Sequence, residues 1–209
     1  MAAPTPAPER KRRLLPRAAR AASILQAASR TFARGGYAAT SMEDIAAEAG
    51  VSKLMLYRHF NSKHELYEAV LEEVRSRLDS VEHRPASLAG LTPAEGVREA
   101  TATLLATMGV AREVPDAYRL LYGHAAHEPE FAAYAGTIRK RAVAKAESLL
   151  VPLIADDSLR RWAAHLIAVL TDEAVLAWLD VGEPERDGYM AERLARIQGA
   201  VVGSVIAPR

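Results

Sequence analysis

The chain has 209 residues, and half of them are hydrophobic, which is enough for a sizeable core in one or two compact units. Lysine and arginine together number 27 against 26 aspartates and glutamates, so the net charge alone indicates no polyanionic partner. The absence of cysteine excludes disulfides and thiolate metal sites, and it fits a reducing cytoplasm.

Residues 1–16 combine a Pro- and Ala-rich stretch with a basic run, and we expect them to form a disordered basic tail. They lack the continuous apolar stretch of a signal peptide. Further along, the apolar segment at 166–179 is interrupted by Thr171, Asp172 and Glu173, so no helix is expected to span a membrane. We therefore expect a cytoplasmic protein with no membrane partner.

Helices are predicted throughout the rest of the chain, because alanine is abundant and no segment alternates in the way that predicts a strand. Apolar residues recur instead at the three- and four-residue spacing of amphipathic helices. The expected helices lie at 17–34, 41–49, 53–59, 63–81, 93–112, 115–127, 129–150, 157–181 and 189–206. A linker is expected at 82–91.

Capping residues mark several of these boundaries. Gly35-Gly36 is typical of a helix C-terminus, and Thr40 with Glu43 predicts a capping box for the second helix. The other expected markers are Ser52, Thr92 with Pro93 and Glu95, Asp156 or Asp157, and a loop that contains Gly182, Pro184 and Gly188.

Residues 41–60 predict a helix-turn-helix, in which two short helices joined by a turn at Gly50 cross at a steep angle. Small alanines allow the helices to approach closely, and Val51 and Leu56 can hold the second helix against Ile45. The outward face of the second helix, which would lie in the major groove of DNA, then carries Lys53, Leu54, Met55, Tyr57 and Arg58.

The string GGYAATSMEDIAAEAGVSKLMLYRHFNSKHELYEAV resembles the DNA-binding domain of TetR-family regulators, and the resemblance covers residues 20–75. The matching pattern is Gly-Tyr, Thr-Ser, Asp-Ile-Ala, Ala-Gly-Val-Ser, Leu-Tyr-x-His-Phe and Ser-Lys-x-x-Leu, in that order. The resemblance implies an all-α fold with a three-helix, helix-turn-helix DNA-binding domain at 17–62. A larger helical effector-binding and dimerisation domain would follow at 63–209, with 63–81 as the connecting helix.

The resemblance also implies a role for each matching position. Thr40 and Ser41 would present a hydroxyl and the amides of the second helix to a phosphate. Tyr57 and His59 would contact the DNA backbone beside the groove, and Lys63 would bind another phosphate. The remaining expected DNA contacts are Ser52, Lys53, Leu54, Met55 and Arg58.

Leu54-Met55 is a departure from the family pattern, which often has a small residue, proline or threonine there. Two bulky apolar side chains cannot hydrogen-bond to bases, but they can pack on thymine methyl groups. Alternatively, one of them turns inward and fills the core. The basic run also has two possible interpretations. Either Arg12, Arg13 or Arg17 reaches the minor groove of the DNA, or the run is a solubilising tail.

The last two expected helices are the candidates for a dimer interface, because the first of them is apolar around much of its circumference. The alternative is burial within one subunit. The expected dimer residues are Trp162, Leu166, Val169, Leu170, Leu176, Leu194, Ile197 and Val201. A twofold dimer would pair two reading helices and would predict a palindromic operator.

The middle helices carry aromatic residues with a few polar tips, which suits a cavity for a small apolar or aromatic effector. Core packing is the alternative for each residue taken alone. The expected effector contacts are Leu105, Met108, Tyr118, Tyr122, His124, Phe131, Tyr134 and His165. His124 and His127 have a spacing that could hold a metal, but without a third ligand we interpret them as an ordinary helix end.

These features together predict a ligand-responsive transcriptional regulator that binds double-stranded operator DNA as a homodimer. Repression is the commoner activity in this family, so we expect a repressor. The alternatives are an activator and a non-specific architectural DNA-binding protein. The chain has no Gly-rich phosphate loop, nucleophile elbow, His-Glu-x-x-His pair or cysteine nucleophile. We therefore expect no enzyme and no cofactor.

Overall fold

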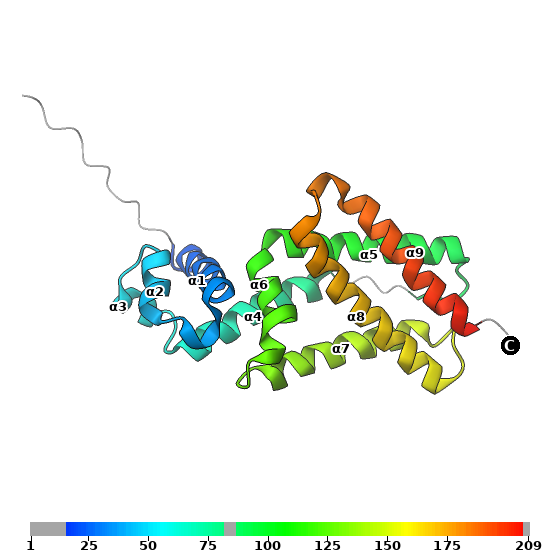
Figure 1. The fold of residues 1–209 in the computed structure, drawn as a ribbon, viewed down its shortest axis with the longest axis horizontal. Helices are drawn as coiled ribbons and strands as arrows, with labels where there is room; N and C mark the ends of the chain where they lie inside the picture. The colour runs from blue at the N-terminus through cyan, green and yellow to red at the C-terminus, as the bar shows by residue number, and fades with distance from the viewer. Residues whose placement is uncertain (1–15, 82–86, 207–209) are drawn as a thin grey trace, which may run out of the picture.

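A computed structural model describes residues 16–81 and 87–206, and all regular structure in these ranges is helical (Figure 1). The prediction of an all-α fold, with a small N-terminal helix-turn-helix unit followed by a larger helical domain, is confirmed. The predicted tail, apart from Pro16, and half of the predicted linker lie outside the described residues.

The N-terminal unit, which we call the head, consists of α1 (Arg17–Ala39), α2 (Met42–Glu48) and α3 (Lys53–Tyr57). A long helix, α4 (Lys63–Val81), leads from the head into the larger domain, which we call the bundle. The helices of the bundle are α5 (Pro93–Glu113), α6 (Pro115–Arg119), α7 (Ala132–Leu150), α8 (Asp157–Val181) and α9 (Asp187–Ile206).

The first helix continues beyond its predicted end, but Gly36 interrupts it as the sequence suggests. Gly36 has a φ of 77°, a left-handed conformation that favours glycine, and one further helical turn follows it. The predicted cap of the second helix is wrong by one residue, because Ser41 and not Thr40 caps α2. The Ser41 hydroxyl accepts from the Asp44 amide, and the Asp44 carboxylate accepts from the Ser41 amide.

The predicted helix at 115–127 is helical throughout but irregular. After α6, a π-helical turn covers Leu120–His124 and a 3₁₀ turn covers Ala125–His127. The predicted start of the next helix at Pro129 is wrong, because a turn places Phe131 at the N-cap of α7. These turns and α6 stand between the head and the rest of the bundle (Figure 1).

The predicted caps of the other helices are confirmed. Ser52 accepts from the amide of Met55, and Thr92 forms a capping box with Glu95. Asp156, and not Asp157, accepts from the first amides of α8. Gly188 lies inside α9 and not in the preceding loop, because a short 3₁₀ turn at Pro184–Arg186 leads directly into that helix.

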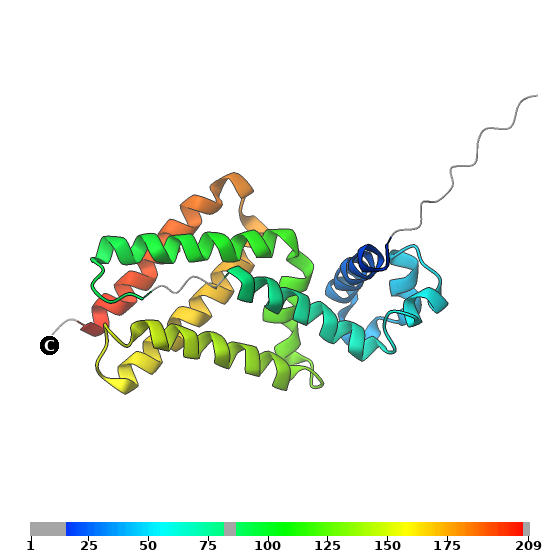
Figure 2. The same ribbon diagram turned by 180° about the vertical axis from the view of Figure 1, so that it is seen from behind.

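The bundle is built on two helix pairs, α5 with α9 and α7 with α8. Figure 2 shows the second half of α4 between α5 and α7. Along α4, Leu66 and Tyr67 belong to the buried core near the head, whereas Leu78 is buried against the bundle. One continuous cluster of buried side chains therefore joins the head to the bundle through α4.

Helix α8 is long and apolar enough, by length and composition alone, to cross a membrane. In the bundle it packs against α7 and α9, with Ala163, Asp172 and Val175 buried on its inner side. Part of its apolar character is therefore used for packing within the fold, where the Asp172 carboxylate is also buried, and the rest faces outward.

Candidate nucleic-acid interface and effector cavity

Helices α2 and α3 form a compact helix-turn-helix. Ile45 and Leu56 are fully buried between the helices, and Val51 packs half-buried beside them. Gly50 makes the turn with a φ of 65°, and a side chain there would be strained. The predicted inward face is confirmed, so the opposite face of α3 is turned to solvent.

The exposed face of α3 carries cationic, apolar and aromatic side chains. Lys53, Tyr57 and Arg58 are exposed, and Leu54 between them is 66% exposed. An isolated exposed leucine is common on protein surfaces, but here it lies at the centre of the face that a major groove would receive. The two bulky apolar residues that depart from the family pattern are therefore not equivalent.

Met55 turns toward α1 and is half-buried. Its sulfur lies 3.7 Å from a guanidinium nitrogen of Arg20, a residue near the start of α1. The start of α1 therefore lies beside the reading helix, with Arg17 exposed one turn earlier. Arg20 is a candidate site residue that the sequence analysis missed. Arg12 and Arg13 lie outside the described residues.

Lys53 lies beside a neighbouring acid. Its ammonium pairs with Glu43 of α2 and lies 5.9 Å from the centre of the Tyr57 ring. The pairing lowers the pKa of Glu43 and raises the pKa of Lys53, because each charge favours the other. The first cation of α3 therefore has an acidic neighbour on α2.

Thr40 and Ser41 are placed differently from the expectation. Thr40 is buried, and its hydroxyl donates to the carbonyl of Gly36 at 2.7 Å, so it is turned away from the surface. The Ser41 hydroxyl is bonded to the Asp44 carboxylate at 2.6 Å. The cap of α2 is thus satisfied within the chain and carries a negative charge, which makes the expected hydroxyl contact of Thr40 with a phosphate incompatible with this structure.

Lys63 lies at the start of α4, and its side chain caps a carbonyl in the last turn of α1. Its ammonium donates to the carbonyl of Tyr37 at 2.8 Å and lies 4.3 Å from the centre of that ring. His59 is half-buried next to Phe60, and Tyr57 remains at the exposed edge. Tyr57 and His59 are accordingly near the reading face, whereas Lys63 has a structural contact in addition to any contact with DNA.

Phe131, an expected effector contact, lies instead in an aromatic cluster where the head meets the bundle. Its ring centre is 4.8 Å from that of Tyr37, 4.2 Å from that of Tyr67 and 4.8 Å from that of His64. The amide of Tyr37 donates to Glu128 at 3.4 Å. Burial and the nearby Glu130 raise the pKa of Tyr37 to about 12, so its hydroxyl remains protonated.

The bundle contains a partly open cavity of about 500 Å³, which is large enough for a small molecule. Its wall is formed by α5, α7, α8 and α9, with Leu78 of α4 and the Tyr118 and Tyr122 side chains at one end. Among its polar wall residues are Thr103, Thr107, Lys145, Thr171, Asp172 and Gln198. The Gln198 amide donates to the Thr171 hydroxyl at 2.9 Å.

The cavity brings together two of the eight expected effector residues, Tyr118 and Tyr122. Met108 is buried in the core behind the wall, and Tyr134 donates to the Glu72 carboxylate at 2.8 Å. Leu105, His124 and His165 face solvent, and Phe131 is in the aromatic cluster. The sequence predicted the region but not the helix faces, because the rotation of α5 and α8 depends on which neighbours they pack against.

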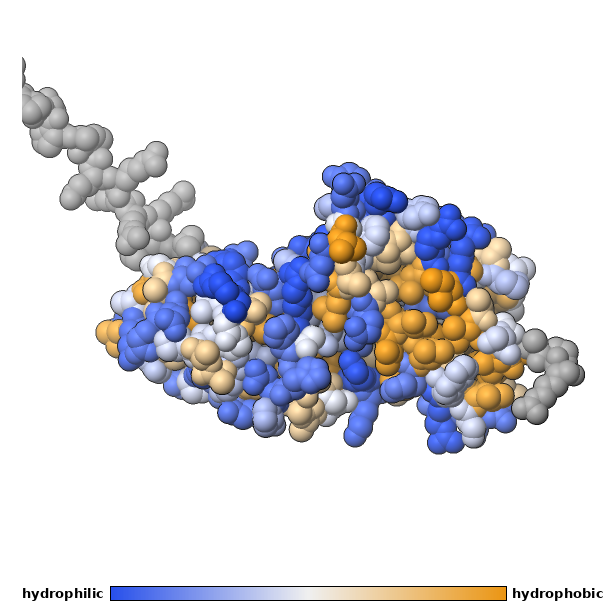
Figure 3. Space-filling model, viewed as in Figure 1, coloured by the Kyte–Doolittle hydropathy of each residue, from blue (hydrophilic) through white to orange (hydrophobic). Residues whose placement is uncertain are grey.

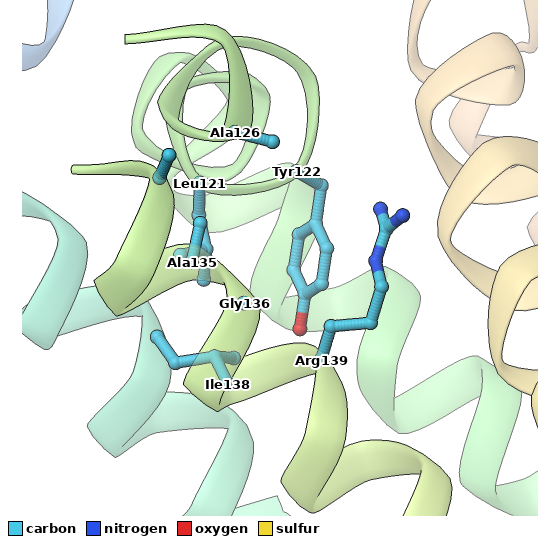
Figure 4. A pocket seen from close by; sticks show the side chains of 8 residues that line it. Leu121, Tyr122, Ala126, Ala135, Gly136, Ile138 and Arg139 are labelled. Atoms are coloured by element: carbon cyan, nitrogen blue, oxygen red, sulfur yellow. The ribbon is translucent and has the colours of Figure 1, made fainter. Parts of the chain in front are cut away.

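A smaller cavity of about 110 Å³ lies beside the π-helical turn (Figure 4). Figure 4 shows Tyr122 and Arg139 side by side in its wall. Tyr122 also lines the larger cavity, and Arg139 lies 3.9 Å from the buried carboxylate of Asp172. The two cavities therefore share the Tyr122 side chain, and Arg139 of the smaller cavity pairs with Asp172 of the larger one.

The outer face of α8 and α9 exposes large apolar side chains. Trp162 is 54% exposed and Ile197 is 52% exposed, with Leu159, Tyr189 and Ile206 also accessible. Figure 3 shows a wide hydrophobic area over these helices. Leu166, Val169, Leu170, Leu176 and Val201 are partly buried. Leu194 is buried within the subunit, so it is unavailable to a partner.

Known proteins resemble this chain most strongly in the head. The family model described as bacterial regulatory proteins, tetR family, matches residues 24–70. The HTH-type transcriptional activator FasR of Mycolicibacterium smegmatis is 55% identical over 58 residues, 28% of this chain and 26% of that protein. The HTH-type transcriptional repressor Rv3405c of Mycobacterium tuberculosis is 42% identical over 81 residues, 39% of this chain and 43% of that protein. The chain thus spans less than half the length of these curated relatives.

Solved structures extend the similarity to the whole fold. The crystal structure of a TetR-like transcriptional regulator from Rhodococcus sp. RHA1 has a TM-score of 0.69 and 25% sequence identity. The alignment covers 90% of this chain and 99% of that chain. The order of a small helical head followed by a helical bundle is therefore shared with that protein.

Proposed function

Since the chain belongs to the TetR family of bacterial regulatory proteins, we propose that it is a cytoplasmic DNA-binding transcriptional regulator without catalytic activity. The observation that carries this proposal is the exposed face of α3. A fully buried Leu56 fixes the helix, while Lys53, Leu54 and Arg58 project from the packed head. A short helix held in this way can enter the major groove as a rigid unit.

The exposed residues divide into two kinds of contact. Arg58 can form a bidentate hydrogen bond with guanine or bind a phosphate, whereas Leu54 can only pack on an apolar group such as the methyl of thymine. Arg17 and Arg20, at the start of α1, supply phosphate or minor-groove contacts beside the reading helix. The contact surface is therefore formed by α3 and the start of α1, without the hydroxyl of Thr40.

The hydrophobic face of α8 and α9 supports a homodimer. An exposed tryptophan and isoleucine on adjacent helices are costly to leave in water, and a second copy of the same face would cover them. A twofold axis through this face would place two heads on the same side of the assembly. The operator would then be a palindrome with one half-site for each α3.

The cavity supports a response to a small effector. Leu78 belongs both to the cavity wall and to α4, the helix that continues into the core of the head. An effector that contacts Leu78 would favour one position of α4 and thereby one separation of the two heads. We propose that the protein represses transcription by occupying the operator, because this mechanism requires only the DNA-binding face of α3. An activator would contact other proteins in addition.

The experiment that tests this function is a selection from random double-stranded oligonucleotides with the purified full chain at near-physiological salt. We expect a palindrome whose half-sites are about one helical turn or slightly more apart. A reporter gene under this operator should then be silenced by the protein, and increased expression would identify an activator. A folded dimer that selects no motif would contradict the specific-regulator proposal and favour an architectural DNA-binding protein.

A matched pair of variants locates the contact surface. Leu54→Ala should weaken operator binding by about tenfold and relax the choice of base at one position of each half-site, since one apolar base contact is lost. Arg98→Ala, an exposed change on α5 far from the head, is the control and should bind as the parent chain does. Equal behaviour of the two variants would place the reading surface elsewhere.

A further inference from the structure

The larger cavity has an aliphatic wall. Its apolar lining is formed mainly by leucine, valine, isoleucine and alanine side chains of α5, α7, α8 and α9. Among the described residues, two aromatic rings line the cavity, Tyr118 and Tyr122, which lie at the same end with ring centres 4.7 Å apart. A planar aromatic ligand would find stacking partners at that end alone, whereas a flexible alkyl chain can contact the wall along its whole length.

The cavity extends along α7 and α9. On α9 its lining extends from Ala195 to Ile206, and on α7 from Ala142 to Leu150, with Leu153 in the turn that follows. At 1.5 Å rise per residue, the α9 segment spans about 16 Å and the α7 segment about 12 Å. An extended alkyl chain can therefore lie along the cavity and contact the wall on both helices.

Glycines keep this space open. Gly96 on α5 and Gly203 on α9 both line the cavity, and a Cβ atom at either position would meet no other atom within 4 Å. Both lie inside helices, where glycine is less favourable than alanine by about 1 kcal/mol. Neither glycine has a positive φ that would require it for the backbone. The local effect of the missing side chains is therefore additional room in the cavity.

We propose that the effector of this protein is a linear aliphatic chain that lies along the cavity between α5, α7, α8 and α9. This inference rests on the proposed function, because it identifies the ligand class of the cavity through which the regulator responds. The chain extends from Tyr118 and Leu78, next to α4, toward Leu153 and Ile206 at the opposite end. Chain length therefore determines how completely one ligand fills the space that reaches α4.

The test uses the purified full chain and a series of straight-chain alcohols from n-hexanol to n-dodecanol, titrated by isothermal calorimetry. An alcohol head group matches the uncharged hydrogen-bonding residues of the wall, Thr107 and Gln198. We expect the Kd to fall about fourfold for each added methylene until the cavity is filled, since each buried methylene contributes a constant transfer free energy. Pyrenemethanol, a planar aromatic alcohol, should bind at least tenfold more weakly than n-dodecanol.

A pair of variants on the same helix locates the binding site. Gly96→Leu adds a side chain to the open end of the cavity, so it should weaken n-dodecanol binding by at least tenfold and n-hexanol binding much less. Gly109→Leu is the control, because Gly109 is exposed on α5 away from the cavity and should leave both affinities unchanged. Circular dichroism of both variants verifies that the helices are intact.

Failure of the ligand class and failure of the regulator are distinguishable. Equal affinities across the alcohol series, or tighter binding of pyrenemethanol, would overturn the aliphatic ligand and leave operator binding untouched. Chain-length dependence that Gly96→Leu does not alter would also overturn it, because binding would then occur outside this cavity. If long alcohols bind as expected but operator affinity does not change, the ligand class stands and the effector response of the proposed function fails.

Discussion

The head and the bundle differ in where their large apolar side chains lie. In the head, Ile24, Phe32, Ile45 and Leu56 are fully buried, and Leu54 is the main apolar exception on the reading face. In the bundle, apolar side chains also line a cavity of about 500 Å³ and cover the outer face of α8 and α9. The head buries nearly all of its large apolar side chains. The bundle, in contrast, retains apolar surface that a ligand and a second subunit can cover.

Under the proposed function, this difference assigns rigidity to the head and the response to a ligand to the bundle. A DNA-reading helix must keep its orientation, and a core without large voids provides that. A sensor must have at least two arrangements of similar free energy, and unfilled space in its core makes this possible. Leu78 of α4 lies where these two requirements meet, at the cavity wall of the helix that enters the head.

The largest expected effect concerns the outer face of the bundle. Replacing both Trp162 and Ile197 by glutamate should give a folded monomer, because two charges cannot be buried at a subunit contact without partners. Operator affinity should fall by about a hundredfold or more when the two heads no longer bind together. Sedimentation velocity and operator titration measure both effects. Leu105→Glu, on an exposed position of α5, is the control, and a dimeric double variant would place the interface on another surface.

The second prediction compares the same truncation in the two regions. Leu56→Ala removes a fully buried side chain from the head and should lower the free energy of unfolding by about 4 kcal/mol. Leu104→Ala, at the wall of the cavity, should cost about 2 kcal/mol, because its side chain already borders empty space. Urea denaturation followed by far-ultraviolet circular dichroism measures both. A larger loss for Leu104→Ala would contradict the idea that the head is the more tightly packed region.

A third prediction concerns the connection between α8 and α9. A Cβ at Gly182 would lie 2.2 Å from the indole of Trp178, whose ring nitrogen donates to Asp187 at 2.7 Å. Gly182→Ala must displace the indole and should lower the free energy of unfolding by about 1–3 kcal/mol. Gly188→Ala is the matched control, because its Cβ would meet nothing within 4 Å. Equal thermal midpoints for the two variants would show that Trp178 moves aside without cost.

The smallest expected effect is a pH dependence at the same connection. Arg112 donates to the Asp187 carboxylate at 2.8 Å and, with Trp178, lowers the pKa of Asp187 below its ordinary value of 3.8. Because the folded pKa is the lower one, this stabilisation is fully present above the unfolded pKa and is lost as the pH falls through the folded pKa.

Asp187→Asn should therefore destabilise the protein by about 1–2 kcal/mol at pH 7 and by less at pH 3. Urea unfolding at both pH values, for the parent and the variant, measures the difference. A stability loss that is the same at both pH values would show that the carboxylate charge does not contribute. Glu183→Gln, on an exposed residue of the same connection, is the control for general charge effects.

The reading face of α3 followed from the sequence because its determinants are local. The spacing of Ile45, Val51 and Leu56 assigns the inward face, and Ser52 sets the first residue of the helix. The cap of α2 was displaced by one residue, since Thr40 and Ser41 are both suitable caps and only the packing of α1 decides between them. The Thr40 hydroxyl donates to the carbonyl of Gly36, so Ser41 is the residue that caps α2.

The cavity could not be found in the same way. Tyr118 and Tyr122 reach it, but Phe131 is drawn into the aromatic cluster with Tyr37 and Tyr67, two residues far away in the sequence. The same limit applies to Leu194, which belongs to the apolar stripe of α9 but is buried within the subunit. Apolar periodicity identifies the face of a helix that is buried but not the element that covers it.

The sequence by itself determined the helical composition, most of the caps and the buried face of the helix α3. These features depend on backbone hydrogen bonds and on side chains within a few turns of one another. Only the tertiary structure decided that Leu54 faces outward while Met55 packs beside Arg20, and that the cavity has an aliphatic wall. Such features depend on the relative rotation of helices distant in the chain, which close packing fixes only when all of them are assembled.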